Sequence, residues 1–275
     1  MSLLENWAEL GDRIFVRRYS EPFDHNVGLV LGGEGALVVD TRTNPAEAKI
    51  LRDEIQAVTT QPIGWVFNTH EHWDHTFGNQ EFPEARIWGH VDCRRRLVEH
   101  GGLFLEEVIG QYPEVSAYRE VVVTPPTETF TESVAIDLGE RTVELAFYGL
   151  GHTSNDAVLH VDGVTFAGDL VEEGNPPSFG DSFPVAWVET IGRLAAAARV
   201  IVVPGHGAPV DPDYLVMFRF DLAWLARTAR EGLQAGTTVE DLSLAGSPYS
   251  EDPAREALSR AYSELSKAYP DLSHD

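Results

Sequence analysis

Cysteine is almost absent from this chain of 275 residues, since Cys93 is its only one. An intramolecular disulfide is therefore excluded, and the protein does not need an oxidising compartment. The sequence also lacks any uninterrupted apolar run near the roughly 20 residues that a membrane-spanning helix requires. The first residues, MSLLENWAELGDR, carry acids where a secretory signal has a basic region. These absences predict a cytoplasmic protein without a membrane span.

Basic residues are scarce relative to acidic ones. The sequence has 20 lysines and arginines against 44 aspartates and glutamates, and its formal net charge is −24. A field of that sign repels nucleic-acid phosphates and anionic membrane surfaces. We therefore expect neither nucleic acid nor a membrane as a partner, and a small-molecule substrate instead. The composition indicates no oligomeric state.

Strand patterns occur in both halves of the chain. Runs rich in β-branched residues at 13–40 predict a small antiparallel meander, and apolar runs follow at 63–69 and 85–90. In the second half, runs within 129–169 are separated by two-residue or Gly-containing turns, which indicates antiparallel pairing. A last apolar strand is expected at 199–207.

Helical patterns lie between and after these strands. Residues 45–58 have apolar positions at helical spacing behind Pro45, which suits a first helical turn. Residues 91–110 and 185–198 also favour helix, and residues 111–129 predict a long loop of the kind that often borders a site.

The order of the elements predicts an α+β fold. Two strand-rich halves, each followed by helices, indicate an αββα sandwich in which two mixed β-sheets pack face to face and helices flank them. No internal repeat or linker divides the chain. We expect one domain over residues 1–275, with residues 212–275 as a helical C-terminal extension.

The densest chemical signal is the segment Asn68-Thr69-His70-Glu71-His72-Trp73-Asp74-His75. It places three histidines and an aspartate within six positions at the end of an apolar strand. A strand end followed by a tight turn can aim these short side chains into one cavity. Imidazole with carboxylate is a ligand set that suits zinc and neighbouring transition metals. The segment therefore predicts a metal site.

Three further strands end near a residue of a metal-binding type. These residues are His152 in YGLGHTSND, Asp169 in VTFAGDLV and His206 in VIVVPGHG. Each has a glycine beside it, and glycine lets the backbone turn sharply and approach a ligand closely. Taken singly, a Gly-His or Gly-Asp pair is also common in ordinary turns. Their combination and order carry the argument.

The combination His-x-His-x-Asp-His, then Gly-His-Thr, Gly-Asp and Gly-His, resembles the metallo-β-lactamase superfamily over roughly residues 13–211. The resemblance implies the αββα fold and two divalent metal ions, with zinc expected and iron or manganese as alternatives. It implies that His70, His72 and His152 hold the first metal. It implies that Asp74, His75 and His206 hold the second, and that Asp169 bridges the two.

Asp40, at the end of GALVVDT, matches the first motif of that family, whose aspartate lies beside the metal ligands and orients them. The need is physical, because a metal-bound histidine usually donates its other ring N–H to a carboxylate or carbonyl. The other histidines and the lone cysteine are not expected to bind the metals. They are His25, His90, His100, His160, His274 and Cys93.

The expected reaction is hydrolysis. Two metals that share a water molecule lower its pKa, so that hydroxide becomes the nucleophile near neutral pH, and they polarise the carbonyl that it attacks. Asp74 is expected to orient the hydroxide and carry its proton.

The resemblance limits the substrate only in part. An aspartate at the bridging position resembles the family's thioesterases and lactonases more than its antibiotic-degrading members, so a thioester or lactone is expected and a β-lactam is disfavoured. Gly207-Ala208-Pro209 departs from glyoxalase II, which counts against glutathione thioesters. Tyr148 and Tyr112 are possible partners for a lactone carbonyl. An iron-dependent oxidoreductase resembling persulfide dioxygenases is the alternative.

Overall fold

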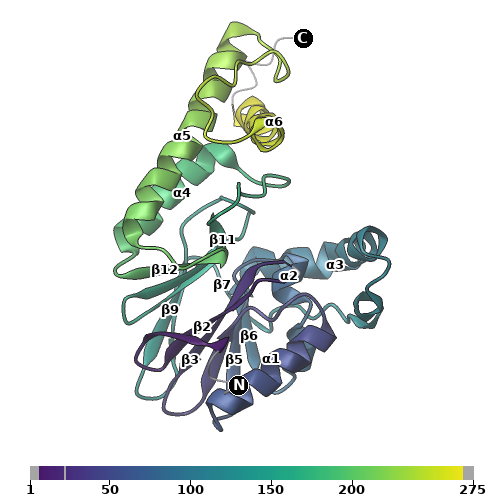
Figure 1. Ribbon diagram of the computed structural model, residues 1–275, viewed down its shortest axis with the longest axis vertical. Helices are drawn as coiled ribbons and strands as arrows, with labels where there is room; N and C mark the ends of the chain where they lie inside the picture. The colour runs from purple at the N-terminus through teal and green to yellow at the C-terminus, as the bar shows by residue number, and fades with distance from the viewer. Residues whose placement is uncertain (1–5, 22, 269–275) are drawn as a thin grey trace.

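The computed structural model describes residues 6–21 and 23–268 (Figure 1). Its first β-sheet is built from the N-terminal half of the chain. Antiparallel pairs join β1 to β2, β2 to β3 and β3 to β4, and parallel pairs continue through β5 and β6 to β7. The strands are β1 (Ala8–Gly11), β2 (Ile14–Tyr19), β3 (His25–Leu31), β4 (Ala36–Val39), β5 (Ile63–Phe67), β6 (Arg86–His90) and β7 (Glu128–Phe130).

The second sheet is built mostly from later strands in the order β8, β9, β10, β11 and β12. All neighbours are antiparallel except β11 and β12, which are parallel. The strands are β8 (Ser133–Asp137), β9 (Thr142–Phe147), β10 (Ala157–Val161), β11 (Val164–Glu172) and β12 (Ile201–His206). The two sheets meet where β3 pairs with β12 through the single register pair His25 and His206.

The period-2 alternation of the strands explains the sandwich. In β3 and β4, Val30 and Leu37 face the core between the two sheets, together with Phe166 of β11. Their neighbours Leu29 and Val38 point the other way and pack against helix α1. Each sheet thus has one face on the shared core and another available for helices.

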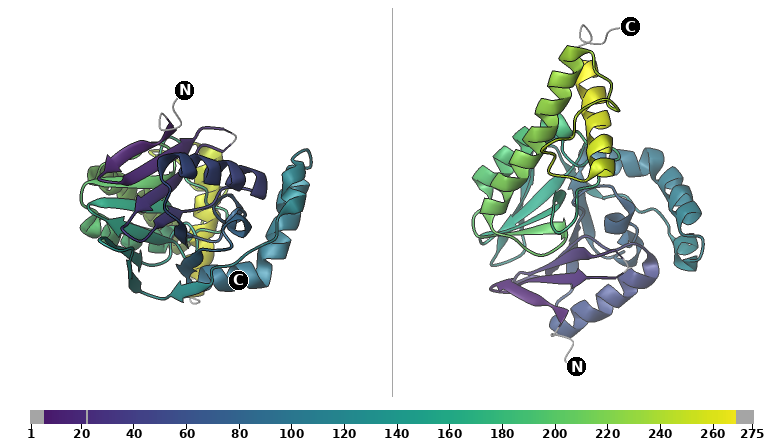
Figure 2. Two further views of the ribbon diagram at one scale, coloured as in Figure 1. Left: turned by 90° about the horizontal axis from the view of Figure 1, so that it is seen from below. Right: turned by 45° about the horizontal axis from the view of Figure 1, so that its top comes forward.

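Helices cover the outer faces of the sheets, as Figures 1 and 2 show. Helix α1 packs on the first sheet, α4 and α5 bury their apolar sides on the second, and α6 packs on α4 and α5. The helices are α1 (Pro45–Val58), α2 (Trp73–Thr76), α3 (Val91–Gln111), α4 (Pro184–Ala197), α5 (Pro212–Ala235) and α6 (Glu251–Ala268). The predicted α+β sandwich with C-terminal helices is confirmed.

Local sequence explains where several helices begin. The Asn44 side chain accepts the Glu47 N–H at the start of α1, with Pro45 in its first turn. The Asp211 side chain accepts the Tyr214 N–H at the start of α5, and Gly236, at φ +68°, ends that helix. These caps satisfy backbone groups that a helix leaves unpaired at its ends.

The structure differs from the prediction in the segment 111–129. Helix α3 continues to Gln111, a short 3₁₀ helix covers Ser116–Glu120, and β7 adds an edge strand at Glu128–Phe130. Tyr118 and Val121 are buried against α3, so this segment forms a small apolar cluster instead of an open loop. The proline and threonine residues of this segment favoured a loop in the sequence analysis, so the packing was not predicted.

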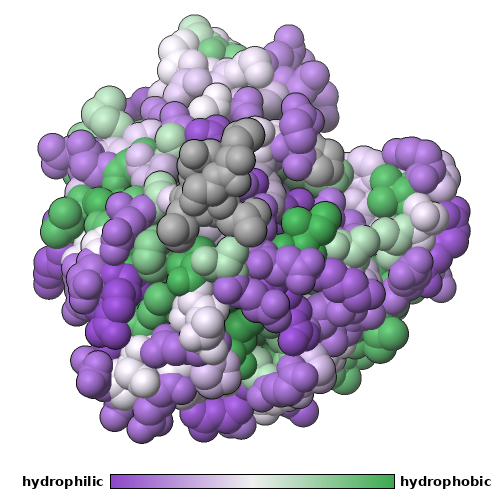
Figure 3. All heavy atoms as spheres, turned by 60° about the horizontal axis from the view of Figure 1, so that its bottom comes forward, coloured by the Kyte–Doolittle hydropathy of each residue, from purple (hydrophilic) through white to green (hydrophobic). Residues whose placement is uncertain are grey.

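Within the described residues, no helix combines the length and the apolar character that a membrane crossing demands. One face of the molecule carries mainly hydrophilic side chains with hydrophobic ones in small groups (Figure 3).

Candidate metal centre

The segment 68–75 lies where the first sheet meets the second. Strand β5 ends at Phe67, and the chain then turns through Asn68–His72 into the short helix α2. His72 occupies the position before that helix with extended backbone. His70 and His75 are fully buried, whereas His72 is half-buried. The turn therefore brings the three imidazoles together, with ring centroids 4.6 Å apart for His70 and His72 and 4.4 Å apart for His70 and His75.

Neighbouring strands of the second sheet supply further side chains. Asp169 lies on β11 and His206 ends the adjacent parallel strand β12, so both side chains reach the same edge of the sheet. His152 comes from the turn between β9 and β10. Asp156 fixes that turn by accepting the backbone N–H and the hydroxyl of Thr153 at 2.8 and 2.7 Å.

Glycine is required where these strands approach the carboxylate. A Cβ atom at Gly205, the residue before His206, would collide with Oδ1 of Asp169. Gly168, the residue before Asp169, has φ +54°, and a Cβ there would lie 2.6 Å from the Thr69 side chain. The glycines beside these two residues thus permit the close packing of the centre.

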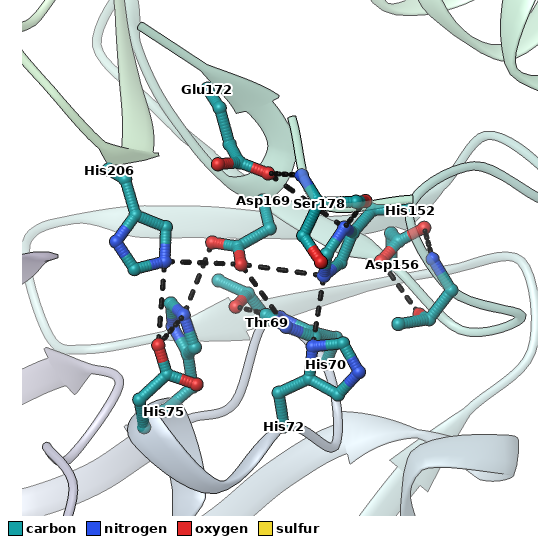
Figure 4. A network of polar contacts seen from close by, with 12 residues as sticks. Thr69, His70, His72, His75, His152, Asp156, Asp169, Glu172, Ser178 and His206 are labelled. Carbon is teal, nitrogen blue, oxygen red and sulfur yellow. Dashed lines mark hydrogen bonds and ion pairs between the residues drawn. The ribbon is translucent and has the colours of Figure 1, made fainter. Parts of the chain in front are cut away.

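The first group of donor atoms consists of His70, His72 and His152 (Figure 4). Nδ1 of His72 lies 2.9 Å from Nε2 of His152. Oδ2 of Asp169 lies 3.4 Å from Nε2 of His152 and 3.7 Å from Nε2 of His70. The three histidines and Asp169 each offer an atom within 4.8 Å of the others.

The second group consists of Asp74, His75 and His206, and its donor atoms also lie within 4.8 Å of one another. Oδ2 of Asp74 is 3.5 Å from Nε2 of His75 and 3.4 Å from Nε2 of His206. Asp169 reaches this group as well, with Oδ1 3.2 Å from His75 and Oδ2 3.2 Å from His206. The Asp169 carboxylate therefore lies between the two groups.

In His75, His152 and His206, the ring nitrogen that points away from the donor groups contacts a separate acceptor. Nδ1 of His75 lies 2.9 Å from the Asp40 carboxylate, and Nδ1 of His152 lies 3.1 Å from the Ser178 carbonyl. Nδ1 of His206 lies 3.2 Å from the Phe23 carbonyl. Such contacts hold a ring in one tautomer and leave its other nitrogen free for a metal.

Several donor atoms at the centre are buried without a hydrogen-bond partner in the part of the chain that the structure describes, as is typical of a metal site. Nε2 of His70, Nε2 of His75 and Oδ1 of Asp169 are buried and have no hydrogen-bond partner among the described residues. Buried polar atoms without a partner are costly, and several that converge on one point are typical of a cation-binding site. The donor set of imidazoles and carboxylates fits zinc, iron or manganese.

Charge around the centre favours cations. Burial opposes ionisation of Asp169, but the neighbouring His206 and His75 outweigh it and hold its pKa well below the ordinary value. Burial likewise opposes protonation of His206, yet the Asp169 and Asp74 carboxylates raise its pKa to about 12. The two carboxylates thus hold positive charge at this point, as a metal site requires.

Asp40 makes the contacts expected of an orienting residue. Its carboxylate accepts the backbone N–H and the hydroxyl of Thr69, both at 2.9 Å, as well as facing His75. Its backbone lies in the left-handed region at φ +62°, which non-glycine residues rarely adopt. Strain of this kind is retained where a functional geometry demands it.

Sequence reasoning did not identify Asp181 or Ser178 as partners of the histidines. Oδ2 of Asp181 lies 3.4 Å from Nε2 of His72, so this carboxylate supports the first group as Asp40 supports the second. The Ser178 N–H donates to Glu172 at 3.0 Å, while its carbonyl faces His152. The loop between β11 and α4 therefore holds two of the histidines, and no spacing in the sequence signals it.

A cavity of about 490 Å³ opens above the two groups. Helix α3 and the turn before α2 supply one wall, and the β11–α4 loop supplies the other. The lining residues are His72, Trp73, Asp74, Arg96, Phe104, Glu107, Val108, Gln111, His152, Asp169, Glu172, Ser178, Gly180, Asp181 and His206.

Other residues considered from sequence lie elsewhere. Tyr148 bonds His160 at 3.0 Å outside this cavity. His90 stacks on Phe147, with ring centroids 4.2 Å apart, and its side chain accepts the Asp92 N–H at the start of α3. Neither tyrosine considered for a lactone carbonyl lines the cavity.

His25 and His100 also stand outside the two groups. His25 is buried with its ring 6.4 Å from that of His75, and burial lowers its pKa to about 3. Its contribution is the backbone pair that aligns β12 and hence His206. His100 is partly exposed beside Glu99, and His274 lies outside the described residues.

Comparisons with known proteins agree with this geometry. A family profile described as "Metallo-beta-lactamase superfamily" matches residues 20–214. A metallo-beta-lactamase from Pontibacter korlensis superposes with a TM-score of 0.64 at 20% identity, covering 79% of this chain and 98% of that one. A double mutant of the sec-alkyl sulfatase PisA1 superposes with a TM-score of 0.74 at 16% identity, covering 96% of this chain and 50% of that one.

Two curated relatives are similar in sequence. A linear primary-alkylsulfatase from a Pseudomonas species is 21% identical, over 76% of this chain and 47% of its own length. A hydroxyacylglutathione hydrolase from a Cyanothece species is 28% identical, over 62% of this chain and 59% of its own length. The chain thus spans between about half and three fifths of these relatives.

Proposed function

Because the chain belongs to the metallo-beta-lactamase superfamily, we propose that it is a metal-dependent hydrolase of carboxylic ester-type bonds, with a thioester or lactone as substrate. One observation carries the proposal. Two groups of ligand-type side chains converge from opposite sides on the Asp169 carboxylate, and a cavity opens directly above them. A purely structural cluster does not need that opening.

Two divalent ions fit these donors. His70, His72 and His152 would hold the first ion, and Asp74, His75 and His206 the second, with Asp169 between them. Bound there, such ions supply polarisation of a carbonyl and a lower pKa for water. Zinc suits the mixed imidazole and carboxylate donors, with iron and manganese as alternatives.

The chain's own residues would orient and deprotonate the attacking water. Asp74 lines the cavity with its side chain 13% exposed, so its carboxylate faces both the histidines and the substrate space. It can therefore hold a water molecule in place and accept its proton. Asp40 and Ser178 would act indirectly, because they keep His75 and His152 in the required orientation.

Asp169 and one of the two relatives support the proposed class of bond. A carboxylate between the two groups resembles the superfamily's thioesterases and lactonases more than its β-lactam-degrading members. The relatives are named hydroxyacylglutathione hydrolase and linear primary-alkylsulfatase. In this chain, however, Ala208 follows the last histidine, and its N–H bonds Glu173 at 2.7 Å, so the segment after His206 departs from glyoxalase II.

The test is turnover of a panel by protein loaded with zinc, iron or manganese. The panel holds a thioester, a lactone, an aryl ester, an alkyl sulfate and a cephalosporin. We expect turnover of the thioester or the lactone, and its loss in Asp74→Ala with an unchanged far-UV spectrum. Glu106→Ala, an exposed acid of α3 outside the cavity, serves as the matched control and retains full activity.

Two results would contradict the proposal. Full activity of Asp74→Ala would exclude the proposed role of that carboxylate. Oxygen uptake with a persulfide, by iron-loaded protein that hydrolyses nothing in the panel, would assign the oxidoreductase chemistry instead.

A further inference from the structure

The cavity above the metal centre is lined unevenly by charge. Among the described residues around it, Arg96 is the one arginine or lysine, whereas Glu107, Glu172 and Asp181 are carboxylates outside the two donor groups. Glu107 is exposed, and the side chain of Asp181 is 39% exposed, so both stand toward the solvent side. A substrate therefore passes acidic side chains before it reaches the centre.

The positive charge of Arg96 is already paired with carboxylates of the protein. Its guanidinium pairs with Glu71, whose side chain is fully buried, and lies 3.5 Å from Asp181. Removing the arginine from Glu71 would leave a buried carboxylate without its cation, which is strongly unfavourable. Asn155 donates to the same carboxylate but brings no charge. The charge of Arg96 is thus already balanced by carboxylates of the protein, which weakens its attraction for an anionic group of a substrate.

The wall beside Arg96 is apolar. Trp73 at the start of α2 and Phe104 and Val108 on α3 line the cavity next to one another in a single cluster. The Arg96 guanidinium lies 5.7 Å from the centre of the Phe104 ring. Behind them, the ring of Phe23 meets that of Trp73 edge-on at 5.0 Å. The wall is therefore held in place and can accept an apolar group.

From these observations we infer that the cavity selects uncharged substrates, whose apolar acyl group lies on the wall of Trp73, Phe104 and Val108. A carboxylate, phosphate or sulfate placed away from the scissile bond is rejected by Glu107, whereas the Asp181 carboxylate is already paired with Arg96 and His72. The inference rests on the proposed hydrolase function and narrows its substrate class. It concerns the far end of the acyl group, because the scissile bond itself lies at the metal centre.

The selection can be measured with a matched pair of substrates in the bond class that the panel identifies. One has a hexanoyl group and the other an adipoyl group, which ends in a free carboxylate at the same chain length. At low ionic strength we expect kcat/KM to be about tenfold higher for the hexanoyl substrate. The ratio should shrink in about 0.5 M salt, which screens exposed charges.

Substitutions that change charge test whether the difference in kcat/KM arises from the cavity. Glu107→Lys should reduce the ratio severalfold at low salt, and Glu107→Gln should reduce it less. Glu106→Lys and Glu106→Gln make the same changes at the adjacent position, which does not line the cavity, and should leave the ratio unchanged. A similar effect at both positions would mean that only the net charge of the protein acts, and it would overturn the assignment to the cavity.

The remaining outcomes separate this inference from the proposed function. Equal turnover of both substrates, or a preference for the adipoyl compound, would overturn charge selection and leave the hydrolase proposal intact. Absence of any turnover across the panel would overturn the hydrolase proposal, and the inference with it.

Discussion

The floor and the rim of the cavity are built in different ways. We call the seven ligand-type residues and Asp40 the floor, and Trp73, Arg96, Phe104, Glu107 and Asp181 the rim. Floor residues lie at or near strand ends of both sheets, in the turn between β9 and β10, or in the turn after β5 and the helix α2 that follows it. Most are buried. Rim residues, apart from Trp73, come from α3 and the β11–α4 loop, and they are at least partly exposed.

This difference separates chemistry from selection. Strand ends are held by pairing on both sides, so donor atoms on the floor keep fixed distances to a metal. A helix and a loop that only border the cavity can change their side chains without disturbing the sheets. We therefore expect floor substitutions to lower turnover of every substrate alike, and rim substitutions to change the preference among substrates.

The largest effect is expected from the centre of the floor. Asp169→Asn keeps the size of the side chain but removes the charge that both donor groups share. We expect kcat/KM to fall by more than about 100-fold for every substrate, since even residues outside the ligand set cost 10- to 100-fold. Metal content by mass spectrometry should fall as well. Retention of two metals with a tenth of the activity or more would contradict the shared role.

Asp40 is the floor residue that contacts a donor histidine without belonging to either donor group. Asp40→Asn weakens the contact to Nδ1 of His75 and allows the other tautomer of that ring. We expect metal affinity, measured by competition with a coloured chelator, to fall by about 10- to 100-fold. Activity should recover at higher metal concentration. An unchanged affinity would show that Asp40 serves only the Thr69 turn.

Asp181 is the matching carboxylate on the rim. It contacts His72 at 3.4 Å, against 2.9 Å for Asp40 and His75, and its side chain is 39% exposed against 3%. Solvent screens the exposed pair more strongly. We expect Asp181→Asn to weaken metal binding by about tenfold or less, in the same chelator assay. A loss equal to that of Asp40→Asn would remove the distinction between floor and rim for this residue.

The sequence predicted the floor better than the rim for a physical reason. His70, His72, Asp74 and His75 are adjacent in the chain, and residue types that bind metals rarely cluster without a cause. Asp181 and Arg96, by contrast, reach the centre from segments with no motif around them. Their contacts depend on how α3 and the β11–α4 loop pack, which residue spacing does not encode. The roles of the seven residues as ligands stay predictions.

The sequence also predicted some elements of the fold better than others. Runs of apolar and β-branched residues predicted β2 to β6 and β8 to β12, because these strands are largely buried in the sandwich. The short edge strand β1 was missed, since its pattern is weak, and β7 was expected only as the start of one run with β8 from residue 129. The 3₁₀ helix at Ser116–Glu120 was missed because one buried residue, Tyr118, holds it in place.

The smallest effect is expected at the apolar wall of the rim, where only part of an acyl group would be in contact. Phe104→Ala removes a ring that lines the cavity without touching the floor. Losing roughly 40 Å² of apolar contact costs about 1 kcal/mol, or about fivefold. This loss should appear in the kcat/KM ratio of an octanoyl to a butanoyl substrate, because the longer chain reaches the wall. Leu103→Ala, at the preceding position, is 58% exposed and does not line the cavity, so it should leave that ratio unchanged. If Phe104→Ala instead lowered both substrates equally, the wall would support the floor and the comparison between the two regions would fail at this residue.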